Sequence, residues 1–133
     1  MLFVARPSHV RTAIAELIAG SPRHDWTIDD VASELLARGV EADFSSVFRG
    51  LSRLADDGTV QRVELGDGKA RFEAARAHHE HVRCERCGAV GEVSGCLVDR
   101  VVPAVEAETG FAVTGHRLLF SGLCGSCAPR GAA

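Results

Sequence analysis

Apolar residues in the first sixty positions recur every three or four residues, the spacing of amphipathic helices, in three separate stretches. We predict helices over residues 8–19, 27–39 and 43–57, with the third beginning at Asp43 or Ser45. Ser8 is the expected cap of the first helix, and Thr27 with Asp30 resembles a capping box at the second. The faces expected to be buried comprise Val10, Ile14, Leu17 and Ile18, then Val31, Leu35 and Leu36, then Val47, Leu51, Leu54 and Ala55.

After Gly58 the apolar period changes to two, which is typical of strands. Residues 60–65 and 69–73 flank a turn at residues 66–68 and are predicted to form a hairpin. Three helices followed by a hairpin is the order of a winged helix, in which the third helix enters the major groove of DNA. We therefore expect an N-terminal winged-helix domain over residues 1–74.

The outer face of the predicted third helix carries residues suited to DNA. Arg49 and Arg53 lie one turn apart, and arginine makes bidentate contacts with phosphate and guanine. The alternative is that the two arginines only keep a solvated helix face soluble. The candidate DNA contacts on this and the first helix are Ser45, Ser46, Arg49, Arg53 and Arg11.

Charge and composition limit these interpretations. The formal net charge of the 133 residues is −3, so DNA binding must depend on a local basic patch. Hydrophobic content of 46% and charged content of 25% are those of an ordinary globular protein, without a long apolar run or a secretory leader. We expect a cytoplasmic protein with no membrane partner.

The composition shifts after the hairpin from arginine-rich helix to histidine, cysteine, glycine and valine. Residues 75–77 are the expected hinge, and residues 78–133 form a second, α/β domain. Within it we predict strand and turns over residues 82–93, a helix over residues 97–108 and a strand over residues 111–121. The fold class is therefore α+β.

Two Cys-x-x-Cys pairs, Cys84 with Cys87 and Cys124 with Cys127, predict a four-sulfur metal site. Four thiolates suit a closed tetrahedral zinc site with a structural role. A rubredoxin-like iron site and oxidised cysteine pairs are the competing interpretations. The fifth cysteine, Cys96, is expected to be a buried small apolar side chain.

A run of histidines immediately precedes the first pair. On an extended strand alternate side chains face opposite ways, so His79 and His81 lie on one side and His78 and Glu80 on the other. Each pair starts a separate site of nitrogen and oxygen ligands, which suits an exchangeable divalent ion. The first is completed by candidates Glu73, Glu92 and His24, and the second by Asp99 and His116.

With these residues the chain resembles the ferric uptake regulator family over nearly its whole length. The stretches that carry the resemblance run from Ser46 to Leu51, from His78 to Gly88 and from Leu119 to Cys127. The resemblance implies a dimeric, metal-dependent transcription regulator, usually a repressor, with a winged helix and an α/β dimerisation domain. It also implies structural zinc at the four cysteines, a sensing site at Glu73, His79, His81, Glu92 and an N-domain histidine, and an additional site at His78, Glu80, Asp99 and His116.

The sequence departs from the family pattern in places. Phe48 replaces the usual recognition-helix tyrosine, which keeps a ring to pack on a thymine methyl and loses the hydroxyl. The segment ahead of Ser8 is short for the family, so a minor-groove contact is expected to be missing. His24 lies beside the family's hinge-ligand position, which corresponds to Asp25, so the fifth ligand of the sensing site stays open.

The ligand types leave the sensed metal open among Fe²⁺, Mn²⁺ and Zn²⁺, with iron favoured by similarity. The expected partners are a palindromic double-stranded DNA operator and a second copy of the chain. One alternative function is a zinc-binding chaperone or buffering protein without DNA binding. A zinc hydrolase is another, but the sequence shows no signature of a substrate pocket beside an open metal site.

Overall fold

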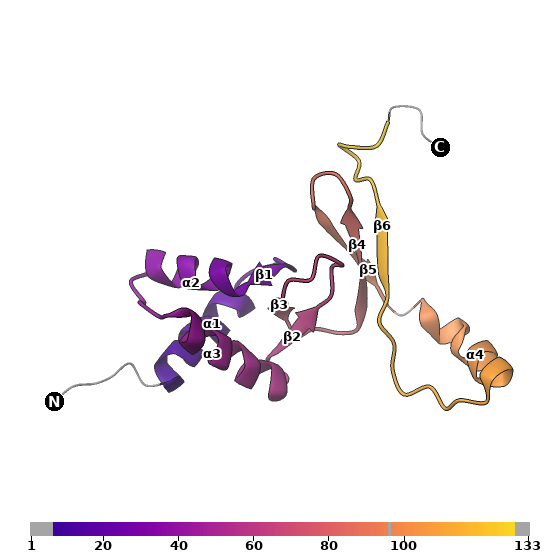
Figure 1. Cartoon of the computed structure of the whole chain (residues 1–133), viewed down its shortest axis with the longest axis horizontal. Coiled ribbons are helices and arrows are strands. Elements are labelled where there is room, and N and C mark those ends of the chain that lie inside the picture. The colour runs from indigo at the N-terminus through magenta and orange to yellow at the C-terminus, as the bar shows by residue number, and fades with distance from the viewer. Residues whose placement is uncertain (1–6, 96, 130–133) are drawn as a thin grey trace. The chain divides into compact units, whose positions relative to one another are not determined.

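A computed structural model describes residues 7–95 and 97–129 of the chain. Cys96 lies outside the described residues. The chain divides into two compact units, Met1–Ala75 and Arg76–Ala133, each with its own three-stranded sheet (Figure 1). No helix among the described residues is long and apolar enough to cross a bilayer.

The first unit contains three helices and a small antiparallel sheet whose strand order is β1-β3-β2. Its elements are α1 (Pro7–Ala19), β1 (Trp26–Thr27), α2 (Ile28–Ala37), α3 (Phe44–Asp56), β2 (Val60–Val63) and β3 (Arg71–Ala74). The winged-helix order expected from the sequence is present, with β2 and β3 forming the hairpin. Gly66 and Gly68 in the hairpin turn have positive φ angles of 78° and 75°, a conformation that favours glycine.

The helix starts follow from local caps. The Thr27 hydroxyl accepts a bond from the Asp30 amide at 3.1 Å, and the Asp30 carboxylate accepts from the Thr27 amide at 3.0 Å, so the predicted capping box is confirmed. Asp43 caps α3 by accepting from the Ser46 amide at 2.8 Å. The prediction for Ser8 is wrong, because α1 already begins at Pro7 and Ser8 lies within it.

A single hydrophobic core fills the first unit. Gly50 allows α1 and α3 to approach closely, since a Cβ there would lie 2.8 Å from the Ile14 side chain. Leu36 was expected in this core, but it is 63% exposed. It follows Leu35 by about 100° around the helix and so falls beyond the edge of the buried stripe. The core comprises Val10, Ile14, Leu17, Ile18, Trp26, Ile28, Val31, Leu35, Val47, Leu51, Leu54, Val60 and Phe72.

The second unit is built on a sheet in which β4 is central, with the order β5-β4-β6. β4 pairs antiparallel with β5 and parallel with β6. The elements are β4 (His79–Cys84), β5 (Val90–Ser94), a 3-10 turn η1 (Val98–Arg100), α4 (Val102–Thr109) and β6 (Leu119–Gly122). α4 ends at Gly110, whose φ is 74°.

Two predictions in this unit differ from the structure. The helix expected over residues 97–108 is split into η1 and α4, because Pro103 has no amide hydrogen and is tolerated only in the first turn of a helix. The strand expected over residues 111–121 forms only at residues 119–122. The register pairs His81 with Leu119, and β4 begins at His79, so most of the predicted strand has no partner on β4.

Candidate functional site

The four cysteines of the second unit converge at the end of its sheet. Pairing of Cys84 with Gly122 across β4 and β6 brings the turn after β4 beside the turn after β6. The Sγ atoms of Cys84, Cys87, Cys124 and Cys127 lie within 4.8 Å of one another, and those of Cys87 and Cys124 are 3.7 Å apart. Zinc bound tetrahedrally at about 2.3 Å from each sulfur would separate the sulfurs by about 3.8 Å. The four thiols therefore fit a zinc site.

Backbone amides prepare this cluster for negative charge. The amides of Cys87 and Cys124 donate to the Cys84 Sγ at 3.5 and 3.4 Å and lower the pKa of that thiol to about 6. The amides of Cys127 and Ser126 likewise lower the pKa of Cys124. Cys127 donates to Cys124 instead, and this bond raises the pKa of Cys127 to about 12. The described cysteines are free thiols, and the cluster offers thiolates that attract a cation.

A second group lies on one face of β4. The Oε1 atom of Glu80 is 2.7 Å from Nε2 of both His78 and His116. Burial of Glu80 works against its charged form, but the bonds from His116 and then His78 outweigh burial and lower its pKa. Two imidazoles and one carboxylate thus converge within ligand distance of one ion. Asp99 was expected in this site, but the structure places it exposed in η1, outside the group.

The alternate residues of β4 form another arrangement. The ring centroids of His79 and His81 are 4.7 Å apart. His81 on β4 is paired with Glu92 on β5. Nδ1 of His79 donates to the Ala77 carbonyl at 2.9 Å, which directs Nε2 away as a potential ligand atom. One oxygen of Glu92 lies 3.7 Å from Nδ1 of His79. These residues have the nitrogen and oxygen chemistry of half a divalent-metal site.

In the first unit, a fully buried carboxylate lies on β3. The side chain of Glu73 is 0% exposed, and its Oε1 accepts a bond from Gln61 at 2.6 Å. Its Oε2 is bonded to Nδ1 of His24. The role of Gln61 was not predicted from the sequence. Counting residues outward from the hairpin turn could have paired it with Glu73. Buried carboxylates need a hydrogen-bonding or cationic partner, and here imidazole and amide supply it.

The segment that carries His24 is held from both sides. The carboxylate of Asp25 accepts a bond from Nε of Arg23 at 2.5 Å. The backbone carbonyl of Asp25 accepts a bond from Nη1 of Arg71 at 3.0 Å. Arg71 also binds Asp67 in the hairpin turn at 2.5 Å. Of the two adjacent residues considered for the hinge ligand, His24 is therefore the one directed at Glu73, whereas Asp25 is paired with arginines.

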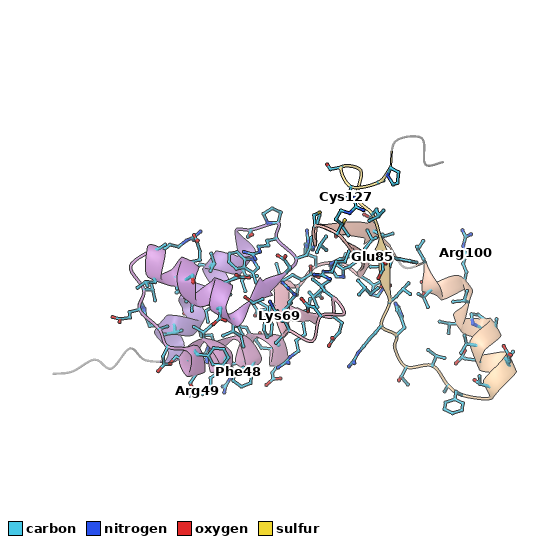
Figure 2. The ribbon with its side chains drawn as sticks, turned by 45° about the horizontal axis from the view of Figure 1, so that its top comes forward. Phe48, Arg49, Lys69, Glu85, Arg100 and Cys127 are labelled. Atoms are coloured by element: carbon cyan, nitrogen blue, oxygen red, sulfur yellow. The ribbon has the colours of Figure 1, made fainter. Side chains whose placement is uncertain are left out.

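The candidate DNA face lies on α3. Ser45, Arg49 and Arg53 are exposed there, and Ser46 is half-buried. Phe48 is 43% exposed, and Figure 2 shows its side chain with that of Arg49 at an outer edge of the unit.

Arg11, on α1, is half-buried. The pKa of Asp57 is lowered chiefly by bonds from Thr59, with Arg11 and Arg53 adding to the effect. The sequence analysis also missed Phe44, a further exposed ring on α3.

Comparison with known proteins agrees with this architecture. The model of the ferric uptake regulator family matches residues 4–121. The ferric uptake regulation protein of Bordetella parapertussis is 30% identical over 118 residues, which are 88% of this chain and 85% of that protein. The structure of the ferric uptake regulator from Francisella tularensis with iron has a TM-score of 0.77 and 26% identity, and the match covers 95% and 94% of the two chains. A zinc uptake regulator complexed with zinc and DNA has a TM-score of 0.66 and 23% identity, with 88% and 79% covered.

Proposed function

The chain belongs to the ferric uptake regulator family, and from this premise we propose that it is a repressor that binds a palindromic operator as a homodimer when a regulatory divalent ion is bound. Members of the family are metal-responsive transcription regulators and not enzymes. The observation that carries the proposal is Glu73, a fully buried carboxylate on a strand of the wing whose oxygens face His24 and Gln61. A metal ligand in that position links ion binding to the element that lies along DNA.

We propose three metal roles for the ligand groups. The four cysteines bind structural zinc, as their sulfur spacing supports. The regulatory ion takes His24 and Glu73 from the first unit and His79, His81 and Glu92 from the second. The additional site consists of His78, Glu80 and His116, with Asp99 recruited only if η1 shifts on binding. Bound at the regulatory site, the ion supplies a coordination link between residues that are distant in the sequence.

The ligand types limit the regulatory metal to a few divalent ions. Imidazole and carboxylate ligands without sulfur accept Fe²⁺, Mn²⁺ and Zn²⁺ alike. Similarity to ferric uptake regulation proteins favours Fe²⁺. We therefore propose Fe²⁺ as the sensed ion in the cytoplasm and Mn²⁺ as an air-stable substitute in the test below.

The residues around each ligand explain how metal occupancy would change DNA affinity. Gln61 holds Glu73, and the Ala77 carbonyl holds the ring of His79, so both ligands are oriented before the ion arrives. Conformations in which these ligands converge would be favoured when the ion is bound. Without the ion, only a fraction of the protein molecules is in those conformations at any time. The apparent affinity for DNA is then the intrinsic affinity multiplied by that fraction.

The test is DNA binding by the zinc-loaded dimer with and without Mn²⁺, measured by fluorescence anisotropy on duplexes that the Mn²⁺-loaded protein selects from a random library. We expect Mn²⁺ to tighten binding at least tenfold and a mild chelator to reverse it. Glu73→Gln should remove the response to Mn²⁺. Glu85→Gln, which changes an exposed carboxylate outside the ligand groups, should leave it unchanged (Figure 2).

The same assay tests the DNA face. Arg49→Ala should weaken binding by about 10-fold to 100-fold for each half-site, the cost of losing one good base contact there. Arg100→Ala removes an exposed arginine from the second unit and serves as the matched control (Figure 2). Equal affinity with and without metal would contradict the metal switch. Metal binding with no selected duplex would instead favour a zinc-buffering protein, the alternative consistent with the net charge of −3.

A further inference from the structure

Two phenylalanine rings on α3 are largely exposed and lie outside the hydrophobic core. Phe44 is 56% exposed and Phe48 is 43% exposed, and the two residues are one helical turn apart. The inner face of α3 is already complete, and neither ring belongs to the hydrophobic core of the described residues. That inner face comprises Val47, Gly50, Leu51 and Leu54, all buried.

The surroundings of the two rings are polar and become cationic along the helix. Ser45 and Arg49 are exposed on the same helix, and the last turn carries Arg53. The first turn contains no acidic residue, but two exposed carboxylates, Glu41 and Asp43, lie just before it. A surface that is apolar and cationic together complements the major groove of DNA, where thymine methyl groups lie between rows of phosphates.

The spacing of the rings fits neighbouring bases. Four residues along a helix correspond to about 6 Å of rise. Successive bases along one DNA strand are separated by about 3.4 Å, so the rings are spaced by about two base steps. Two separate thymine methyl groups are therefore within the span of one helical turn of α3.

We propose that Phe44 is a second thymine-reading residue, which packs on the methyl group of a thymine close to the thymine contacted by Phe48. The proposal rests on the DNA-binding function above and adds to it a specificity. The operator half-site contains two thymines within about two base steps, and Phe44 accounts for recognition of one of them.

The test compares methyl-dependent binding in a double-mutant cycle. The Mn²⁺-loaded dimer first selects a duplex from a random library. That duplex is then synthesised with thymidine throughout, or with deoxyuridine, which lacks only the methyl group, at the thymines of one half-site. Burial of one methyl group is worth about fourfold in affinity, so wild type should lose about 16-fold on the deoxyuridine duplex. Phe44→Ala should bind the thymidine duplex about 16-fold more weakly than wild type, because one methyl contact is lost in each of the two half-sites. The affinity of Phe44→Ala for the deoxyuridine duplex should be only about fourfold lower than its affinity for the thymidine duplex.

The controls separate a lost contact from other effects. Any effect of deoxyuridine on duplex shape weakens the binding of wild type and of Phe44→Ala alike. It therefore cancels when the loss of affinity of one protein is divided by that of the other. Phe44→Leu keeps an apolar side chain and should retain part of the methyl dependence. Leu36→Ala removes an exposed apolar side chain from α2 and should retain all of it. Fluorescence of Trp26, the only tryptophan, reports that the first unit remains folded.

Two results would overturn the inference in distinguishable ways. If wild type binds a selected duplex but Phe44→Ala shows the same 16-fold methyl dependence, Phe44 reads no thymine and the proposed function still stands. If wild type selects no duplex at all, the DNA-binding function fails and the inference fails with it.

Discussion

The two units of the chain stabilise their sheets by different means. In the first unit, the apolar faces of three helices and a sheet meet in one continuous core. In the described part of the second unit, the buried side chains are instead Cys84, His79 and Glu80, each a member of a ligand group. The large apolar residues of the second unit lie mostly at its surface, namely Leu97, Val101, Val105, Phe111, Phe120 and Leu123.

This contrast shows what each unit requires in order to fold. A unit of fewer than sixty residues buries only about 60% of the surface that its unfolded chain exposes, so its stability from apolar packing alone is marginal. Metal coordination and association with another copy are the usual supplements. We therefore expect the first unit to be stabilised by its own core, and the second by its ligand groups and by cover for its exposed apolar residues.

The largest effect is expected from disruption of the cysteine cluster. Cys84→Ser removes the buried thiol that accepts two amide bonds, and structural zinc contributes on the order of 10 kcal/mol to domains of this kind. We expect amide hydrogen exchange to lose its protection in β4 and β6 and to keep it in α1 and α3. Ser126→Ala, a change within the same turn that spares every thiol, is the control. Retained protection in β4 would refute a structural role of the metal.

Next in size is a cavity in the core of the first unit. Leu51 is completely buried, and Leu51→Ala should lower the free energy of unfolding by about 2 to 5 kcal/mol. Urea unfolding followed by Trp26 fluorescence measures the stability of this unit. The absorption of Co²⁺ bound in place of zinc at the four cysteines reports whether the second unit is intact. The cobalt spectrum should be unchanged. The control Leu36→Ala, at an exposed position, should cost less than about 0.5 kcal/mol.

A smaller effect is expected from the capping box of α2. Thr27→Ala removes the hydroxyl that accepts the Asp30 amide and should cost about 1 kcal/mol in the same urea experiment. Thr27→Ser keeps that acceptor and should cost only a few tenths of a kcal/mol. Equal losses in the two variants would show that the methyl group, and not the cap, is responsible.

The smallest effect is a pH dependence at the same cap. Burial of Asp30 raises its pKa, but bonds from the Thr27 amide and hydroxyl, with Arg23 and Arg71, outweigh burial and lower it below the ordinary 3.8. A lowered pKa in the folded state means that Asp30 stabilises the first unit above pH 3.8 and loses this contribution as the pH falls further. Wild type should therefore lose stability more steeply than Asp30→Asn below pH 3.8. Parallel pH curves for the two proteins would contradict the role of Asp30.

The sequence was sufficient for features that depend on neighbours in the chain. Thr27 and Asp30 lie three residues apart, so their capping box was visible in advance, as was the turn between β2 and β3. Features that depend on distant partners were missed or overextended. β1 exists only because Trp26 and Thr27 pair with Phe72 and Arg71, more than forty residues away. The predicted strand over residues 111–121 had a suitable apolar pattern but lacked a partner for most of its length.

The same distinction holds for the ligand groups. Cysteine spacing predicted which four thiols would meet, and strand alternation predicted which histidines of β4 would share a face. The support of Glu73 by Gln61 depends on hairpin register, and the displacement of Asp99 depends on the break at η1. Local patterns therefore identified candidate ligands, but not the residues that orient them.

The parallel pairing of β4 with β6 has a consequence for the order of folding. His81 and Leu119 must meet across 37 intervening residues, whereas the hairpin of the first unit closes over the seven residues between Val63 and Arg71. Long-range pairing slows folding because the entropy of closing the loop is lost before contacts compensate for it. The helical unit should thus reach its native state while the other remains open, with its thiols exposed to solvent and to oxidants until the last strand is in place.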